Sequence, residues 1–155
     1  MGARGLQQRL KLLPHTLFGW FQRKEDRRTP RQITGARGEK AAAKYLRRHG
    51  YKVLLRNFRS GKAEVDIVAR DKDWLVFVEV KTRETEEFGA PSEAVDREKQ
   101  RNLSKAALDY LRLLGNPRIH FRFDVVEVVQ PQGARRPDDI RLIQNAFDLS
   151  EPYIY

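Results

Sequence analysis

Residues 63–83, AEVDIVARDKDWLVFVEVKTR, constrain the fold more than any other stretch of this chain. The stretch is rich in Val, Ile, Phe and Trp, and the polar pair Lys72-Asp73 interrupts it. This pattern predicts two strands, over 64–70 and 74–83, joined by a tight turn. Strands joined so tightly pair as an antiparallel hairpin, so we expect β structure at the centre of the molecule.

The length of the turn sets which residues face each other across the hairpin. With a two-residue turn, Val68 lies opposite Phe77, and Asp66 lies opposite Glu79. Side chains alternate between the two faces of a strand. One predicted face is therefore entirely apolar and suits a core: Val65, Ile67, Ala69, Val76, Val78 and Val80.

The opposite face of the hairpin carries Glu64, Asp66, Glu79 and Lys81. Like charges opposed across a strand pair are destabilising, and a buried carboxylate needs a partner or a metal ion. A Mg²⁺ ion held by Asp66 and Glu79 would remove the repulsion, and Lys81 would then lie beside it. A solvent-exposed face with a Glu64–Lys81 ion pair explains the charges equally well, so both interpretations stay open at this point.

The composition favours a soluble protein with an anionic partner. A chain of 155 residues suits one domain, and 31 Lys and Arg against 21 Asp and Glu give a net charge of +10. Such a charge favours nucleic acid, with an anionic membrane surface as the alternative. The absence of cysteine excludes disulfides and thiolate metal sites and fits a cytoplasmic location. No apolar run approaches the roughly eighteen residues needed to span a bilayer.

The basic residues are concentrated at the N-terminus. Residues 1–33 contain eight Lys or Arg and two acidic residues, and leucines recur there at three- and four-residue steps. We expect a basic arm over 1–33, either poorly ordered or folded as an amphipathic helix. The main domain is expected over 34–149, followed by a tail over 150–155.

The remaining pattern alternates between helix and strand signals. The expected elements are a helix from a Thr34 cap to His49, a strand over 51–59, a helix from Ser92 to Leu114, and strands over 118–129 and 140–147. The order is helix, three strands, helix, two strands. This order suits an α/β fold with a mixed sheet flanked by helices.

Several segments together resemble a known family. Asp66, followed thirteen residues later by Glu79-Val80-Lys81, is similar to the D…E-x-K core of the PD-(D/E)xK, or restriction-endonuclease-like, nuclease superfamily. The chain more narrowly resembles the YraN-like family of small bacterial proteins. The segments that carry this resemblance are 35–51, 57–59, 63–71, 76–83, 88–95 and 122–128.

The resemblance implies a restriction-endonuclease-like fold and a metal-dependent endonuclease acting on DNA. The core pattern is similar to that of junction resolvases, so the resemblance implies branched or junction DNA as the substrate. Asp66 and Glu79 would hold Mg²⁺ or Mn²⁺, with the Val80 carbonyl as a third oxygen. Lys81 would assist the attacking water or stabilise the transition state.

Further residues are implied by position. A glutamate on the first helix approaches the metal in this superfamily, and Glu39 matches it. A polar residue of the later helix orients water or phosphate, and Lys99-Gln100 match that place, with Gln100 in the supporting catalytic role. The candidate nucleic-acid contacts are Arg37, Lys40, Arg56, Arg59, Arg83 and Lys99.

Two other functions compete with the nuclease. In one, the fold is a binding module for nucleic acid or protein, and its carboxylates are catalytically idle. In the other, the N-terminal arm attaches the domain to an anionic membrane. The domain is small and has no separate recognition module, which leaves a partner protein or a homodimer as the source of specificity.

Overall fold

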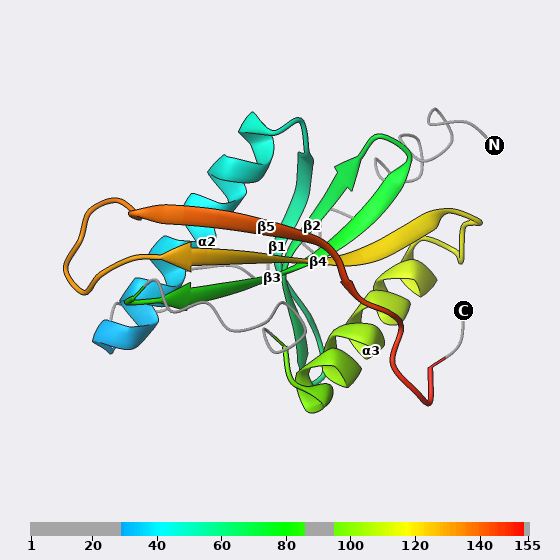
Figure 1. The fold of residues 1–155 in the computed structure, drawn as a ribbon. Helices are drawn as coiled ribbons and strands as arrows, with labels where there is room; N and C mark the ends of the chain where they lie inside the picture. The colour runs from blue at the N-terminus through cyan, green and yellow to red at the C-terminus, as the bar shows by residue number, and fades with distance from the viewer. Residues whose placement is uncertain (1–28, 86–94, 154–155) are drawn as a thin grey trace.

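A five-stranded mixed sheet between two helices makes up the part of the chain that our computed structural model describes, residues 29–85 and 95–153 (Figure 1). The elements are α2 (Pro30–Arg48), β1 (Lys52–Ser60), β2 (Ala63–Asp71), β3 (Trp74–Arg83), α3 (Arg97–Leu113), β4 (His120–Val129) and β5 (Asp139–Phe147). Both the predicted order and the α/β class are confirmed. Most of the expected N-terminal arm, residues 1–28, and most of segment 88–95 lie outside the described residues.

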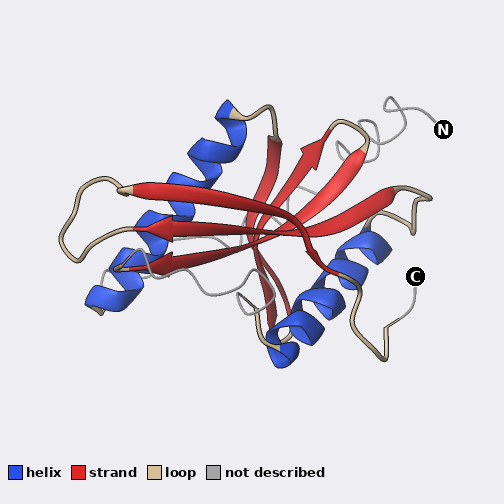
Figure 2. Cartoon of the chain, in the orientation of Figure 1, coloured by secondary structure: helices blue, strands red, loops and turns tan. Residues whose placement is uncertain are grey.

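The sheet has the order β1-β2-β3-β4-β5. Its strand pairs are antiparallel except for β3 and β4, which run parallel from the Trp74–His120 pair to the Arg83–Val129 pair. Parallel neighbours need a crossover connection, and α3 lies within it. Figure 2 shows α2 and α3 on opposite faces of this sheet.

Helix α2 begins earlier than its sequence pattern indicated. Thr29 caps it, because its hydroxyl accepts the Gln32 N–H at 3.3 Å while the Gln32 side chain accepts the Thr29 N–H at 2.9 Å. Pro30 then occupies the first turn, where a missing N–H does no harm. The predicted cap at Thr34 is therefore wrong, and Thr34 instead donates to the Pro30 carbonyl within the helix. The predicted stop at Gly50 is confirmed by its φ of 87°.

Helix α3 begins later than predicted. Asp96 is its cap and accepts the Lys99 N–H at 2.8 Å, so the helix does not include Val95 or Asp96. The expected start at Ser92 falls outside the described residues. A carboxylate side chain one step before a helical run is a better N-cap than a hydroxyl further away, and the prediction overlooked it.

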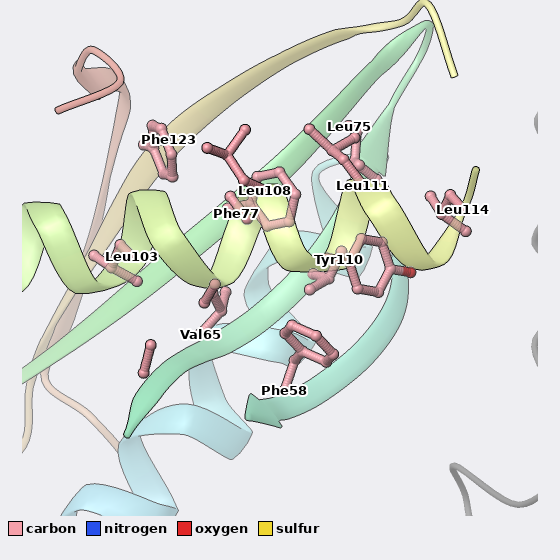
Figure 3. Packing of buried hydrophobic residues seen from close by; sticks show 14 of the residues in the cluster. Phe58, Val65, Leu75, Phe77, Leu103, Leu108, Tyr110, Leu111, Leu114 and Phe123 are labelled. Carbon is pink, nitrogen blue, oxygen red and sulfur yellow. The ribbon is translucent and has the colours of Figure 1, made fainter. Parts of the chain in front are cut away.

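Each face of the sheet has its own apolar core. On one face α2 supplies Ala42, Ala43 and Leu46, which pack with Ile67, Ala69, Val76, Val78, Val126 and Val128. On the other, α3 supplies Leu103, Leu108, Tyr110 and Leu111, which pack with Phe58, Val65, Leu75, Phe77 and Phe123 (Figure 3). The Tyr110 ring meets Phe58 and Phe77 edge to face, at 5.1 and 5.8 Å between ring centroids.

The central hairpin follows the predicted register and then opens. The pairs run from Asp71–Trp74 to Ile67–Val78, as a two-residue turn requires, and end there. Beyond that point β2 pairs with β1 and β3 pairs with β4, so the two strands of the hairpin diverge (Figure 1). The divergence also explains a wrong prediction: Val65 packs in the α3 core and not with Ile67.

Candidate functional site

Glu79 lies where β3 parts from β2, and it is only 4 % exposed. Its Oε1 is 3.3 Å from the Lys81 ammonium, and its Oε2 is 3.1 Å from the Lys99 ammonium. A buried carboxylate is tolerated only with such partners. The solvent-exposed face considered from the sequence is therefore wrong at this residue. Its ion pair is wrong as well, because Glu64 pairs with Arg59 at 3.2 Å.

Asp66 lies on the other diverging strand and is bonded differently. Its Oδ2 accepts the Val80 backbone N–H at 2.8 Å. Burial, followed by the negative charge of Glu79, raises the pKa of Asp66 to about 8, although the Val80 hydrogen bond and Lys99 act in the opposite direction. Burial and the neighbouring carboxylate therefore disfavour the charged form of Asp66, even with two lysines beside Glu79.

Glu39 reaches the same region from α2 and is held by β1. Its Oε2 accepts a hydrogen bond from the Asn57 side chain at 2.8 Å and lies 3.7 Å from the Arg56 guanidinium. Asn57 has a φ of 53°, a left-handed conformation that asparagine tolerates better than most residues. The sequence pattern did not indicate Asn57 as a residue of the site. No local signal distinguished it, because Asn57 lies beside the polar residues Arg56, Arg59 and Ser60 of β1.

A cleft of about 660 Å³ brings Glu39, Asp66 and Glu79 together. It lies between the first turns of α2 and the end of β3, and Val80 is also part of its wall. Its other lining residues are Thr29, Pro30, Arg31, Thr34, Gly35, Thr82, Arg83, Glu84 and Gln132. Three of the predicted carboxylates thus share one hollow surface.

Gln100 has a different position from the one expected. Its side-chain amide donates to the Val95 carbonyl at 2.9 Å, and it does not line the cleft. The bond ties the side chain back to the residue before the helix cap. Gln100 therefore stabilises the start of α3 in this structure.

Most of the predicted nucleic-acid contacts are engaged by carboxylates. Arg56, Arg59 and Lys99 pair with the glutamates described above, and Arg83 lies 3.8 Å from Glu127. Two of the predicted contacts, Arg37 and Lys40, are exposed on α2. The basic residues nearest the site thus also balance its negative charge.

A second polar cluster lies at the other end of β4 and holds the sheet together. Buried Asp124 accepts hydrogen bonds from Arg122 and from the Tyr51 hydroxyl, and Arg122 also donates to Asp71 at 2.9 Å. The Arg122 guanidinium lies 2.9 Å from the Asp124 carboxylate. This network links β4 to β2 and to Tyr51, which lies between α2 and β1.

The sequence model described as uncharacterised protein family UPF0102 matches residues 38–128. The chain belongs to this family. The match includes Glu39, Asp66, Glu79 and Lys99, and it confirms the YraN-like resemblance. No helix within residues 29–85 and 95–153 is both long and apolar enough to cross a membrane.

Relatives in the UPF0102 family resemble the chain over most of their own length. A UPF0102 protein of Desulfosudis oleivorans is 46% identical over 120 residues, which cover 77% of this chain and 94% of the relative. One of Geobacter sulfurreducens is 49% identical over 121 residues, covering 77% and 91%. One of Symbiobacterium thermophilum is 49% identical over 114 residues, covering 73% and 94%.

The donor atoms of this UPF0102 site fit a magnesium-like ion. Asp66 and Glu79 offer hard oxygen ligands, and burial together with the charge of Glu79 raises the pKa of Asp66. Within the described residues, no three His, Cys, Asp or Glu side chains converge to hold a metal by themselves. A bound ion would therefore rest on two carboxylates and complete its shell with backbone, water or substrate oxygens, as Mg²⁺ usually does.

Proposed function

We propose that this UPF0102 protein is a metal-dependent endonuclease that hydrolyses DNA phosphodiester bonds, with a PD-(D/E)xK site. The observation that carries the proposal is the position of Asp66 and Glu79. Both lie where the central hairpin opens, beside a cleft, and Lys81 contacts Glu79. Holding the buried Glu79 beside the half-buried Asp66 is costly, and binding a cation is a function that would offset this cost.

The residues of the site have distinct proposed roles. Asp66, Glu79 and the Val80 carbonyl would hold Mg²⁺ or Mn²⁺. The bound ion would supply positive charge to the phosphate and lower the pKa of a water molecule. The Lys81 ammonium, held at Glu79, would stabilise the negative charge that develops on the phosphate oxygens. Glu39, fixed by Asn57, would orient the water from the α2 side of the cleft.

The charge of the chain supports a nucleic acid substrate. The net charge is +10, and Arg31 and Arg83 line the cleft beside the carboxylates. We propose DNA, and branched DNA in particular, by analogy with junction resolvases that share the D…E-x-K pattern. A partner protein or a second copy of the chain would supply further specificity.

One observation favours the alternative of a non-catalytic binding module. Both carboxylate oxygens of Glu79 already have ammonium partners from the chain itself. The two lysines offset negative charge at Glu79 without any metal. The binding module is therefore the second candidate, and the same experiment separates the two.

The test is cleavage of labelled single-stranded, duplex, flap and four-way-junction DNA in Mg²⁺ and in Mn²⁺. Wild type runs beside Glu79→Gln and Lys81→Met, and DNA binding is recorded for the same samples. The proposal expects cutting that needs metal and is lost in both variants. Binding without cutting, unchanged in the variants, would instead establish the binding module. Cutting that persists in both variants would indicate a contaminating nuclease.

A further inference from the structure

We propose that Lys99 is a resident counterion of Glu79, which a divalent cation must displace in order to bind. The inference deepens the metal-binding part of the proposed function and rests on it. It assigns Lys99 to the control of metal affinity, a role different from the nucleic-acid contact expected from the sequence.

Both carboxylate oxygens of Glu79 already have an ammonium group beside them. The Lys99 ammonium lies 3.1 Å from Oε2, and the Lys81 ammonium lies 3.3 Å from Oε1. The residue is only 4 % exposed, so little of the carboxylate remains open to solvent. A cation that approaches a Glu79 oxygen therefore competes directly with an ammonium group.

Lys99 lies in the first turn of α3, where a lysine is electrostatically unfavourable. It is the third helical residue of α3, after the Asp96 cap. The amino end of a helix carries partial positive charge, which favours anions and disfavours a lysine there. Glu98 has the favourable sign at this end and Lys99 has the unfavourable one. Glu79, together with the more distant charges of Asp66 and Glu64, supplies the compensating attraction.

Lys99 and Lys81 reach Glu79 from different elements of the fold. Lys81 is two residues from Glu79 on the same strand, and its backbone is paired with Glu127 of β4. Lys99 comes from a separate helix, and its side chain is about as exposed as that of Lys81, at 31 % against 34 %. Its ammonium can leave Glu79 for water by side-chain rotation alone, without moving a strand. The proposed function keeps Lys81 at Glu79, so we assign the displacement by a metal ion to Lys99.

The experiment is calorimetric titration of metal-free protein with Mn²⁺ alone. Wild type is compared with Lys99→Met, which keeps much of the apolar stem and removes the charge, and with Lys99→Arg, which keeps the charge. Lys105→Met is the matched control, because Lys105 lies on the same helix and pairs with Asp109, outside the cleft. Thermal melting establishes that each variant is folded, and Lys99→Gln replaces Lys99→Met in the comparison if the latter is not.

We expect Lys99→Met to bind Mn²⁺ roughly three- to tenfold more tightly than wild type, as loss of a competitor worth up to about one ion pair requires. Lys99→Arg and Lys105→Met should bind like wild type, and Glu79→Gln should lose the binding. Mn²⁺ binding that appears only in Lys99→Met would support the inference even more directly.

Other outcomes overturn the inference in distinguishable ways. Wild-type binding that is unchanged or weakened in Lys99→Met refutes the counterion role but leaves the proposed nuclease intact. Tighter Mn²⁺ binding in Lys105→Met as well would show that the change in affinity comes from the net charge of the protein and not from Lys99 at Glu79. Absence of Mn²⁺ binding in wild type and in Lys99→Met refutes both the counterion role and the metal-dependent nuclease.

Discussion

At the scale of single residues, the two central carboxylates have unequal partners. Glu79 contacts two ammonium groups, whereas Asp66 accepts a backbone N–H and lies close enough to Glu79 for repulsion to raise its pKa. The difference arises because Lys81 and Lys99 both reach Glu79. The protonation of Asp66 should therefore change with pH near neutrality.

Asp66 should make the metal-free protein less stable as the pH rises. Its pKa is 3.8 when unperturbed and about 8 in the fold, so between these values the folded state binds more protons than the unfolded state. The free energy of unfolding then falls as pH increases through this window. Asp66→Asn should remove this fall, and its gain over wild type at pH 8 should be on the order of a few kcal/mol at most. Urea denaturation in the presence of a chelator, at pH 5 and at pH 8, measures the free energy of unfolding of both proteins.

Asp109 provides a control of opposite sign. A hydrogen bond from Ser60 is the main cause that lowers the pKa of Asp109, so its stabilisation is present above its unperturbed value and lost in acid. Asp109→Asn should therefore not reproduce the gain at pH 8. An Asp66→Asn variant whose stability falls with pH as steeply as wild type would contradict the assignment.

Asn57 combines a backbone role with a side-chain role, and two substitutions separate them. Asn57→Gly suits a φ of 53° but loses the hydrogen bond to Glu39, whereas Asn57→Ala loses both. We expect Ala to lower the free energy of unfolding by about 1 kcal/mol more than Gly does. Both should reduce kcat of DNA cleavage while KM changes little. Equal stability of the two variants in chemical denaturation would show that the backbone is not strained.

Part of the site could be predicted from residue spacing, and part could not. The hairpin pattern placed Asp66, Glu79 and Lys81 together, because a two-residue turn fixes their register. The contact between Lys99 and Glu79 joins separate elements, and nothing local in the sequence specifies it. Gln100, its neighbour, was predicted in the site and instead bonds to Val95.

At the scale of the elements, the position of α2 over β3 depends on one close contact. A Cβ atom at Gly38 would lie 1.9 Å from the Thr82 hydroxyl oxygen, so any larger residue requires Thr82 or the helix to shift. Both residues belong to the elements that enclose the cleft, and Thr82 is part of its wall. The contact sets how near α2, and with it Glu39, approaches the strands that carry Asp66 and Glu79.

Two alanine substitutions in α2 should act in opposite directions. Gly38→Ala must push the helix from β3 and should cost about 1–3 kcal/mol, as overpacking does. Gly35→Ala meets no atom within 4 Å and should stabilise the helix by about 0.5–1 kcal/mol. Thermal melting of the two variants measures this, with Gly35→Ala as the matched control. Gly38→Ala as stable as Gly35→Ala would mean that the helix moves freely on the sheet.

The elements themselves were predictable, but their ends were less so. Apolar alternation and helical spacing identified both helices and all five strands of the described chain, because burial on a sheet face imposes those periods. The caps were misplaced since several residues near each end qualify. Thr29 displaced Thr34 through its reciprocal bond with Gln32, which depends on backbone geometry.

At the scale of the whole molecule, charge is distributed unevenly along the sequence. Residues 1–28 contain seven Lys or Arg and two acidic residues. In the folded domain, many basic side chains are paired with carboxylates, as at Arg59–Glu64 and Arg141–Glu127. The N-terminal residues are therefore a major source of the net positive charge that would attract nucleic acid.

Removing residues 1–28 should weaken DNA binding and make it less sensitive to salt. Each phosphate contact contributes about −0.9 to the slope of log K against log salt, so losing basic residues flattens the slope. The truncation leaves the Thr29 cap of α2 in place, so the domain should melt as before. Binding of duplex DNA between 50 and 200 mM salt, roughly the range over which such effects are large, provides the measurement. An unchanged slope would exclude these residues from the interface.

The parallel pairing of β3 with β4 also has a consequence for the order in which the chain folds. The hairpin that carries Asp66 and Glu79 closes over a short loop, whereas β4 can join β3 only after the whole crossover, including α3, has been arranged. We therefore expect the two carboxylates to meet early, with Lys81 already beside them, and Lys99 to arrive late. During synthesis, the acidic pair would be exposed before its second counterion is in place.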